Sequence, residues 1–197
     1  MHTQEEAAEI LEPFIDPLAE LWPAAWGRWT RLGEDYPEAH VHLSARARAS
    51  LLYDWAAARA RTLFSGQEPS VRFEEAYGFL LICIEDHLYL RLKKFRNGTL
   101  TSCGIPTRQN RLFAAQEPLP GMPKATNLVL GYQLDPFQTG IERVAVSCSL
   151  FNRVMWSLDL PAPGGAVVIK HPAAPQGPLP PSIRSKRGQE EQRNEGS

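Results

Sequence analysis

The chain has 197 residues, of which 43% are hydrophobic and 22% are charged, and its formal net charge at pH 7 is −1. This size and mix is typical of one globular domain with a substantial core, and it excludes a fibre or a wholly disordered chain. The balanced charge is unlike the overall basic excess of most duplex-binding domains. The longest apolar run (78–84) is too short for a membrane helix. The acidic N-terminal segment is unlike a signal peptide. We therefore expect a cytoplasmic protein without a membrane-spanning segment.

The N-terminal segment is predicted to be helical. Thr3 and Glu6 have the spacing of a capping box, which predicts a helix that begins at the residue after Thr3. Proline removes a helical hydrogen bond and clashes with the preceding turn. We therefore expect Pro13, Pro17 and Pro23 to break this segment into short helices.

Three tryptophans follow at helical spacing. Trp22, Trp26 and Trp29 are four and three residues apart, so a helix places their indoles on one side. Aromatic residues in this pattern usually pack into a core. The alternative is an exposed interface for a partner or a membrane surface, and the sequence leaves both interpretations open.

The strongest helix prediction covers 45–65. Ser44 is suited to cap its N-terminus and Gly66 to end it. Its arginines do not fall on one line, which favours a solvated face over a nucleic-acid-binding helix. The expected buried stripe is Leu51, Leu52, Trp55, Ala58, Thr62 and Leu63.

Strand patterns begin at residue 71. The run 79–84 is continuously apolar, 88–93 alternates, and the charged residues between them predict a hairpin turn. A short helix is expected near 107–116. Three further alternating runs end near Leu160 and predict an antiparallel meander.

Helices followed by strands, without a regular βαβ alternation, predict an α+β fold in which N-terminal helices pack on a mostly antiparallel sheet of about five strands. We expect a helical part at 1–66 and a sheet part at 67–160 of the same domain. Seven of the 17 prolines lie in 161–197. This segment has too little apolar surface to offset its ordering entropy, so we expect a proline-rich disordered tail.

The second strand of the hairpin is the main candidate for a nucleic-acid-binding surface. Cations that neutralise phosphates and aromatic rings that stack on bases are the expected components of such a surface. Basic residues also protect strands from edge pairing, which is the structural alternative. The candidate residues are Tyr89, Arg91, Lys93, Lys94 and Arg96, with Phe95 among them.

Two weaker chemical candidates remain. Glu85 and Asp86 could hold the divalent metal ion of a nuclease, although the hairpin has no Glu-x-Lys motif and solvated turn residues are the simpler interpretation. Cys103 precedes a predicted helix and could be a reactive thiol, although an incidental loop cysteine is the simpler interpretation. The usual nucleotide-binding, zinc-peptidase and hydrolase motifs are missing from the sequence, and we expect no cofactor.

Several segments resemble a family of proteins. They occur in this order: Leu90–Lys94, Thr107–Gln109, Gly131–Asp135, Gly140–Val144 and Trp156–Leu160. The region 79–160 is similar to small uncharacterised bacterial proteins of mobile elements that pair with regulators joining a helix-turn-helix to an ImmA/IrrE-type domain, as in Rosmer-type toxin–antitoxin pairs used in phage defence. None of these segments is a catalytic motif, so no catalytic residue is assigned.

The resemblance implies an effector, or toxin, that acts through protein binding and is restrained by a cognate regulator or antitoxin. One alternative is a nucleic-acid-binding protein or metal-dependent nuclease that uses the basic strand 91–96. Another is a non-catalytic adaptor domain. Enzymatic activity, the target and the oligomeric state are left open by the sequence.

Overall fold

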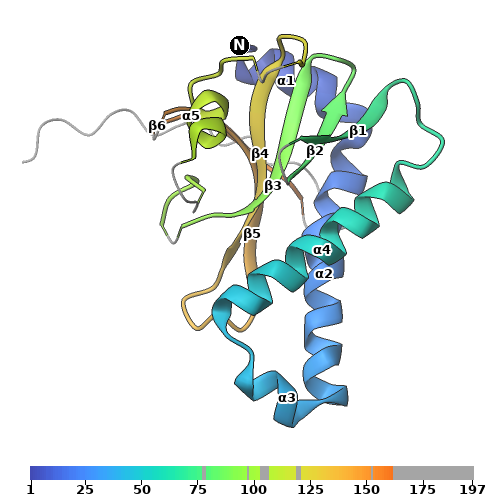
Figure 1. Ribbon diagram of the computed structural model, residues 1–197, viewed down its shortest axis with the longest axis vertical. Helices are drawn as coiled ribbons and strands as arrows, with labels where there is room; N and C mark the ends of the chain where they lie inside the picture. Colours follow the sequence, from blue (N-terminus) through green and yellow to red (C-terminus); the bar gives the residue numbers. More distant parts are fainter. Residues whose placement is uncertain (77–78, 97, 103–106, 119–120, 152, 162–197) are drawn as a thin grey trace, which may run out of the picture.

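The computed structural model describes residues 1–76, 79–96, 98–102, 107–118, 121–151 and 153–161 (Figure 1). The helices are α1 (Gln4–Leu11), the 3-10 helix η1 (Glu12–Phe14), α2 (Ile15–Asp35), α3 (Pro37–His42), α4 (Ala45–Leu63) and α5 (Arg108–Ala114). The strands are β1 (Val71–Ala76), β2 (Phe79–Ile84), β3 (Leu88–Lys94), β4 (Thr126–Leu134), β5 (Ile141–Leu150) and β6 (Arg153–Asp159). Apart from residue 161, the expected disordered tail lies outside the described residues.

The strands form one sheet whose spatial order follows the chain, β1 to β6. All neighbours are antiparallel except β3 and β4, which are parallel. The α+β prediction is therefore confirmed. The sheet has one strand more than the five expected, and the additional strand is β1. The antiparallel meander predicted for the last three runs is confirmed as β4, β5 and β6. The sequence did not indicate that this meander joins the first three strands through a parallel pair. Parallel neighbours need a long crossover, and the segment 95–125 with α5 supplies it.

The proline prediction is only partly correct. Pro13 lies in η1, where the helix tightens, but α2 continues through Pro17 and Pro23. Pro17 stands in the first turn of α2, where the amide has no helical acceptor to lose. Pro23 lies inside α2 beside the buried Trp22, so the packing of this helix outweighs the loss of one backbone hydrogen bond. The capping box is confirmed, because Thr3 and Glu6 each accept the other's backbone amide.

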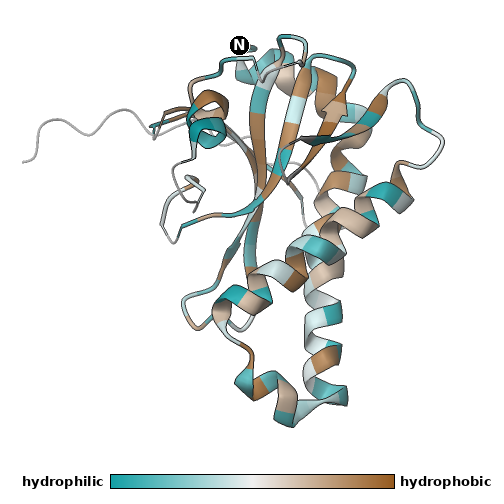
Figure 2. Ribbon diagram, viewed as in Figure 1, coloured by the Kyte–Doolittle hydropathy of each residue, from teal (hydrophilic) through white to brown (hydrophobic). Residues whose placement is uncertain are grey.

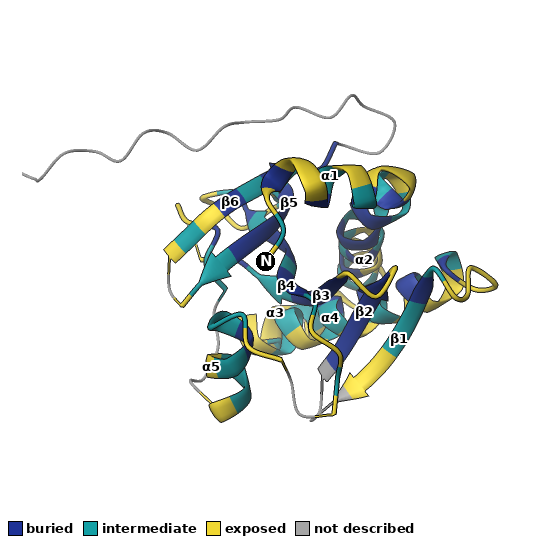
Figure 3. Cartoon of the chain, turned by 90° about the horizontal axis from the view of Figure 1, so that it is seen from above, coloured by how far each residue is buried: buried dark blue, intermediate teal, exposed yellow. Residues whose placement is uncertain are grey.

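Both faces of the sheet are covered. The main core packs α1, α2 and α4 on one face, whereas Phe113 of α5 packs on the other face against Leu81, Cys83 and Tyr89. Figure 3 shows α1 and α2 on one side of the sheet and α5 on the other, with buried residues concentrated on the strands between them. The apolar colouring of the central strands in Figure 2 follows from this double covering.

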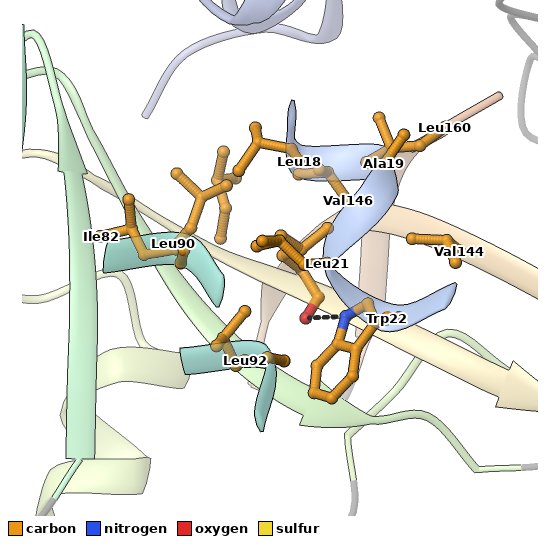
Figure 4. Packing of buried hydrophobic residues seen from close by; sticks show 14 of the residues in the cluster. Leu18, Ala19, Leu21, Trp22, Ile82, Leu90, Leu92, Val144, Val146 and Leu160 are labelled. Carbon is orange, nitrogen blue, oxygen red and sulfur yellow. Dashed lines mark hydrogen bonds between the residues drawn. The ribbon is translucent and has the colours of Figure 1, made fainter. Parts of the chain in front are cut away.

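Trp22 anchors α2 to the centre of the sheet. Its indole Nε1 donates to the carbonyl of Leu130 at 3.3 Å, the dashed line in Figure 4, and its ring lies 4.5 Å from the ring of Tyr132. Both side chains are 1% exposed. The polar atom of a buried tryptophan is thereby satisfied, and the ring supplies a large apolar contact.

The ends of α4 are confirmed as predicted. Ser44 accepts the Ala47 amide through its hydroxyl, and Gly66 has a φ of +79°. The predicted stripe is partly wrong, because Ala58 and Thr62 are exposed. Leu52 is buried as predicted, whereas Ala56 and Ala60 are buried although the stripe did not include them, since small side chains allow α4 to lie close against α2.

Within the described residues, no helix combines the length and the apolar character needed to cross a bilayer.

Candidate functional site

A cleft lies between β3 and the first half of α4. Its volume is about 590 Å³, within the range of small-molecule sites. We call it the β3–α4 cleft. It is lined by Trp22, Arg46, Ala49, Ser50, Tyr53, Asp54, Leu80, Arg91, Leu92, Lys93, Lys94 and Tyr132.

The cleft forms where β3 extends past β2. The β2–β3 pairing runs from Ile84 back to Leu81, whereas the β3–β4 pairing continues as far as Lys94. At the start of β2, the Leu80 amide donates to the Tyr53 hydroxyl at 3.0 Å. This bond ties β2 to α4 where its pairing with β3 has ended, so the last residues of β3 pair only with β4.

Trp22 and Tyr132 form the floor of the cleft. Their rings are tilted by 47° against each other and are almost completely buried. Burial raises the pKa of Tyr132 to about 12, and the nearby Arg48 lowers it slightly. The floor therefore presents neutral aromatic surface at physiological pH.

Cations dominate the polar lining. Arg46 reaches the cleft from α4, and Arg91, Lys93 and Lys94 reach it from β3, against the single carboxylate of Asp54. Burial lowers the pKa of Lys93, and the neighbouring Arg91 lowers it further. Burial likewise lowers the pKa of Arg91 to about 10. Two desolvated positive charges that repel each other are stabilised by an anion, so this lining favours a negatively charged ligand.

Arg91 also connects the cleft with the opposite face of the sheet. Its Nη1 donates to Oδ1 of Asn110 at 2.7 Å, and its guanidinium carbon lies 5.0 Å from the centre of the Phe113 ring. Both partners belong to α5. The guanidinium is thereby held in one orientation, which lowers the entropic cost of using it to bind a ligand.

The structure brings together part of the predicted basic surface. Arg91, Lys93 and Lys94 line the cleft, whereas Arg96 is exposed and is not among the lining residues. Tyr89 is buried, with its hydroxyl donating to the Pro123 carbonyl at 3.3 Å. Phe95 is also buried, against Gly131 of β4. Neither ring is accessible for base stacking, so that part of the sequence interpretation is corrected.

Residues of α4 complete the site, and the sequence interpretation did not include them. Arg46, Ser50 and Asp54 recur every fourth residue, so they lie along one line of the helix. Tyr53 adds an aromatic ring and a hydroxyl beside them. The only sequence signal for this line is a polar stripe on the predicted helix, which solvent exposure explains equally well.

Glu85 and Asp86 lie at the other end of β3. Both are exposed in the β2–β3 turn with positive φ, and Asp86 pairs with Arg72. Asp86 and Lys94 are eight residues apart, about 25 Å along an extended strand, so the turn and the cleft are separate. Within the residues that the structure describes, no group of three or more His, Cys, Asp or Glu side chains is arranged to hold a metal ion.

The tryptophans do not form one exposed interface. Trp22 and Trp29 are buried in the core, so they are not accessible to a partner, and Trp26 is half-buried. The guanidinium of Arg48 lies 6.0 Å from the rings of both Trp26 and Trp29. The cluster therefore mainly packs α2 in the core. Cys103 lies outside the described residues.

No protein-family model matches the chain, and no curated protein or solved structure proves similar to it. The chemistry of the β3–α4 cleft is therefore the basis for the function proposed below.

Proposed function

We propose that this protein binds single-stranded nucleic acid in the β3–α4 cleft. The observation that carries the proposal is the lining of Arg46, Arg91, Lys93 and Lys94 with one carboxylate, beside the half-buried ring of Tyr53. Cations that neutralise phosphates supply most of the affinity for nucleic acid, and aromatic side chains accept unstacked bases. A volume of about 590 Å³ suits a nucleotide-sized unit of a single strand and is too small for a duplex.

The electrostatics support the same ligand. Burial and the charge of Arg91 already disfavour the protonated form of Lys93, and a phosphate near both side chains removes that penalty. Arg91 is held by Asn110 before any ligand enters. Binding an anion therefore requires little further ordering of the Arg91 side chain, so little conformational entropy is lost.

The test is fluorescence anisotropy with a labelled single-stranded oligonucleotide of about eight nucleotides, titrated at several salt concentrations. We expect binding to weaken with salt, and a variant with both Lys93→Ala and Lys94→Ala to lose at least about tenfold in affinity at low salt. Each phosphate contact on a single strand contributes about 0.7 to the salt slope, so the slope of this variant falls by about 1.4.

Arg108→Ala with Arg153→Ala is the matched control, because both are exposed cations outside the cleft lining, in α5 and β6. It removes two positive charges without touching the lining, so its affinity should remain near that of the unchanged protein. Absence of binding at low salt, or an equal loss in the control, would contradict the proposal.

A second proposal retains the effector function that the resemblance of 79–160 implies. The observation that favours a protein partner is the group of exposed apolar side chains Val41 (78% exposed) and Phe137 (86% exposed), in α3 and in the β4–β5 turn. Figure 1 shows these two segments at the same end of the molecule, and Arg48 of α4 donates to Gln138 in that turn. Apolar side chains grouped on a surface are typical of protein-binding sites.

The corresponding experiment is inducible expression in a bacterial host, with and without the product of the adjacent gene. An effector arrests growth, the adjacent product relieves the arrest, and Val41→Asp with Phe137→Asp prevents the relief. Normal growth in every culture would instead favour an adaptor.

A further inference from the structure

The β3–α4 cleft contains one residue that a site for phosphate alone does not need. Asp54 places a carboxylate in a lining that otherwise carries cations, hydroxyls and aromatic rings. A carboxylate repels phosphate, so its presence lowers the affinity for the charged part of a nucleic acid. It complements a hydrogen-bond donor, which points to a donor on the ligand beside the phosphate.

Asp54 lies away from the end of the cleft that Arg46 and Lys94 occupy. Arg46 and Asp54 are eight residues apart on α4, which is about 12 Å along a helix. Lys94 pairs in register with Tyr132, and the charge of Arg48 acts on the Tyr132 phenol, so this end of β3 lies beside the start of α4.

The other end of the cleft is marked by Tyr53, which directly precedes Asp54 and binds the Leu80 amide of β2. Arg46 and Lys94 therefore lie at the end of the cleft beside the start of α4, whereas Asp54 lies one to two turns further, at the end where Arg91 pairs with Leu81. A phosphate bound between Arg46 and Lys94 would have Ser50 and Asp54 as the next polar residues along α4.

We infer that the cleft selects ribonucleic over deoxyribonucleic strands, with Asp54 accepting a hydrogen bond from a ribose 2′-hydroxyl. This inference rests on the proposed function and names its substrate class. The 2′-hydroxyl is the donor that RNA has and DNA lacks at each sugar. Carboxylates are established acceptors for ribose hydroxyls in nucleotide sites. Asp54 is exposed on α4, so its side chain can be changed without disturbing the core.

The experiment compares oligo(U) with oligo(dU) of the same length, since these strands differ only in the 2′-hydroxyl. We expect the unchanged protein to bind oligo(U) about tenfold more tightly, the size expected for a hydrogen bond to a charged acceptor. Asp54→Ala should lower the affinity for oligo(U) and raise the affinity for oligo(dU). The substitution removes a hydrogen-bond acceptor that only oligo(U) uses, and it removes a charge that repels both strands. Asp54→Asn retains an acceptor oxygen and should keep part of the preference.

Glu9→Ala is the control, because Glu9 is an exposed acid of α1 and its removal changes the net charge by the same amount. It should leave the ratio of the two affinities unchanged. If the ratio of the oligo(U) and oligo(dU) affinities is unchanged in Asp54→Ala, or if both affinities rise equally, the inference is overturned while the proposed function stands.

A second pair of strands separates sugar from base recognition. If Asp54→Ala weakens oligo(C) and oligo(dC) alike, the carboxylate accepts from the cytosine amino group, and the inference is overturned. If the unchanged protein binds none of these strands at low salt, the proposed function itself fails.

Discussion

Gly131 shows how tightly single residues are packed beside the cleft floor. A Cβ at this position of β4 would overlap Cε2 of Phe95, whose ring is fully buried. Backbone and ring can approach this closely only because residue 131 has no side chain. We expect Gly131→Ala to lower the free energy of unfolding by roughly 1–3 kcal/mol through overpacking.

Urea denaturation of Gly131→Ala measures this loss. Combining it with Phe95→Leu should recover part of the stability, because the smaller side chain leaves room for the added methyl group. A loss that Phe95→Leu does not reduce would mean that the ring is not the source of the strain.

The buried thiols predict a loss of stability at alkaline pH. Burial raises the pKa of Cys83 to about 12 and that of Cys148 to about 11, with Glu74 adding to the first shift. A thiol with a raised pKa contributes stability below its unfolded pKa of 9.0, and this contribution is lost as the pH rises toward the folded value. At pH 10 the raised pKa of each thiol should lower the free energy of unfolding by about 1 kcal/mol relative to neutral pH.

The measurement is the free energy of unfolding at pH 7.5 and at pH 10, in the protein and in a variant with Cys83→Ala and Cys148→Ala. The difference between the two pH values should be smaller in the variant. An unchanged difference would show that other groups control the alkaline loss.

At the scale of elements, one glutamine attaches α5 to the sheet. The side chain of Gln116, just after α5, accepts from the Asn127 amide at 2.8 Å and donates to the carbonyls of Asn127 and Ser149 at 2.8 and 2.9 Å. It thus makes with β4 and β5 the hydrogen bonds that a strand residue would make. Asn127 is buried, so its amide has no access to water when this partner is removed.

We expect Gln116→Ala to lower the free energy of unfolding by roughly 1–3 kcal/mol, the penalty for leaving buried backbone groups unsatisfied. Gln116→Glu should be at least as harmful, because a carboxylate cannot donate to the two carbonyls. Hydrogen exchange at Asn127 is the direct measurement, with Gln133→Ala in β4 as the control. Unchanged protection of Asn127 in Gln116→Ala would contradict this role.

Elements with local signals were predictable from the sequence. The ends of α4 depend on Ser44 and Gly66, and the β2–β3 hairpin depends on alternation around a charged turn. The parallel neighbours β3 and β4 have no local signal, because side-chain alternation is the same in parallel and antiparallel pairs. The buried line of α4 was only partly predicted, because packing on α2 also selects alanines, which a pattern of large apolar residues does not indicate.

At the scale of the whole molecule, the cleft was also only partly predictable from the sequence, because it forms between elements that are far apart in the chain. Lys93 and Lys94 were identified because they stand together on one strand. Arg46 and Tyr53 join them only through the packing of α4 beside β3, about 40 residues earlier in the chain. Tyr89 was misassigned because the sequence does not show that α5 covers that face of β3.

Binding in a cleft that exists only in the folded state should stabilise the whole molecule. At a ligand concentration of 100 times Kd, mass action adds about 2.7 kcal/mol, which corresponds to a rise in Tm of roughly 5–10 °C for a domain of this size. We expect oligo(U) to produce this shift in the unchanged protein and not in the Lys93→Ala, Lys94→Ala variant. Equal shifts in both would place the ligand elsewhere on the molecule.

The parallel pair at the centre of the sheet also has a consequence for how the chain folds. Leu88 pairs with Thr126 and Lys94 with Tyr132, so the partners are 38 residues apart, whereas Leu128 and Cys148 of the next pair are 20 apart. Closing the larger loop costs more chain entropy, which makes the joining of β3 and β4 a slow step relative to the hairpins. During synthesis the basic strand leaves the ribosome well before Tyr132. A nascent chain that ends between the two therefore carries the cations of the cleft without Tyr132, and we expect the proposed ligand binding to begin only with the completed sheet.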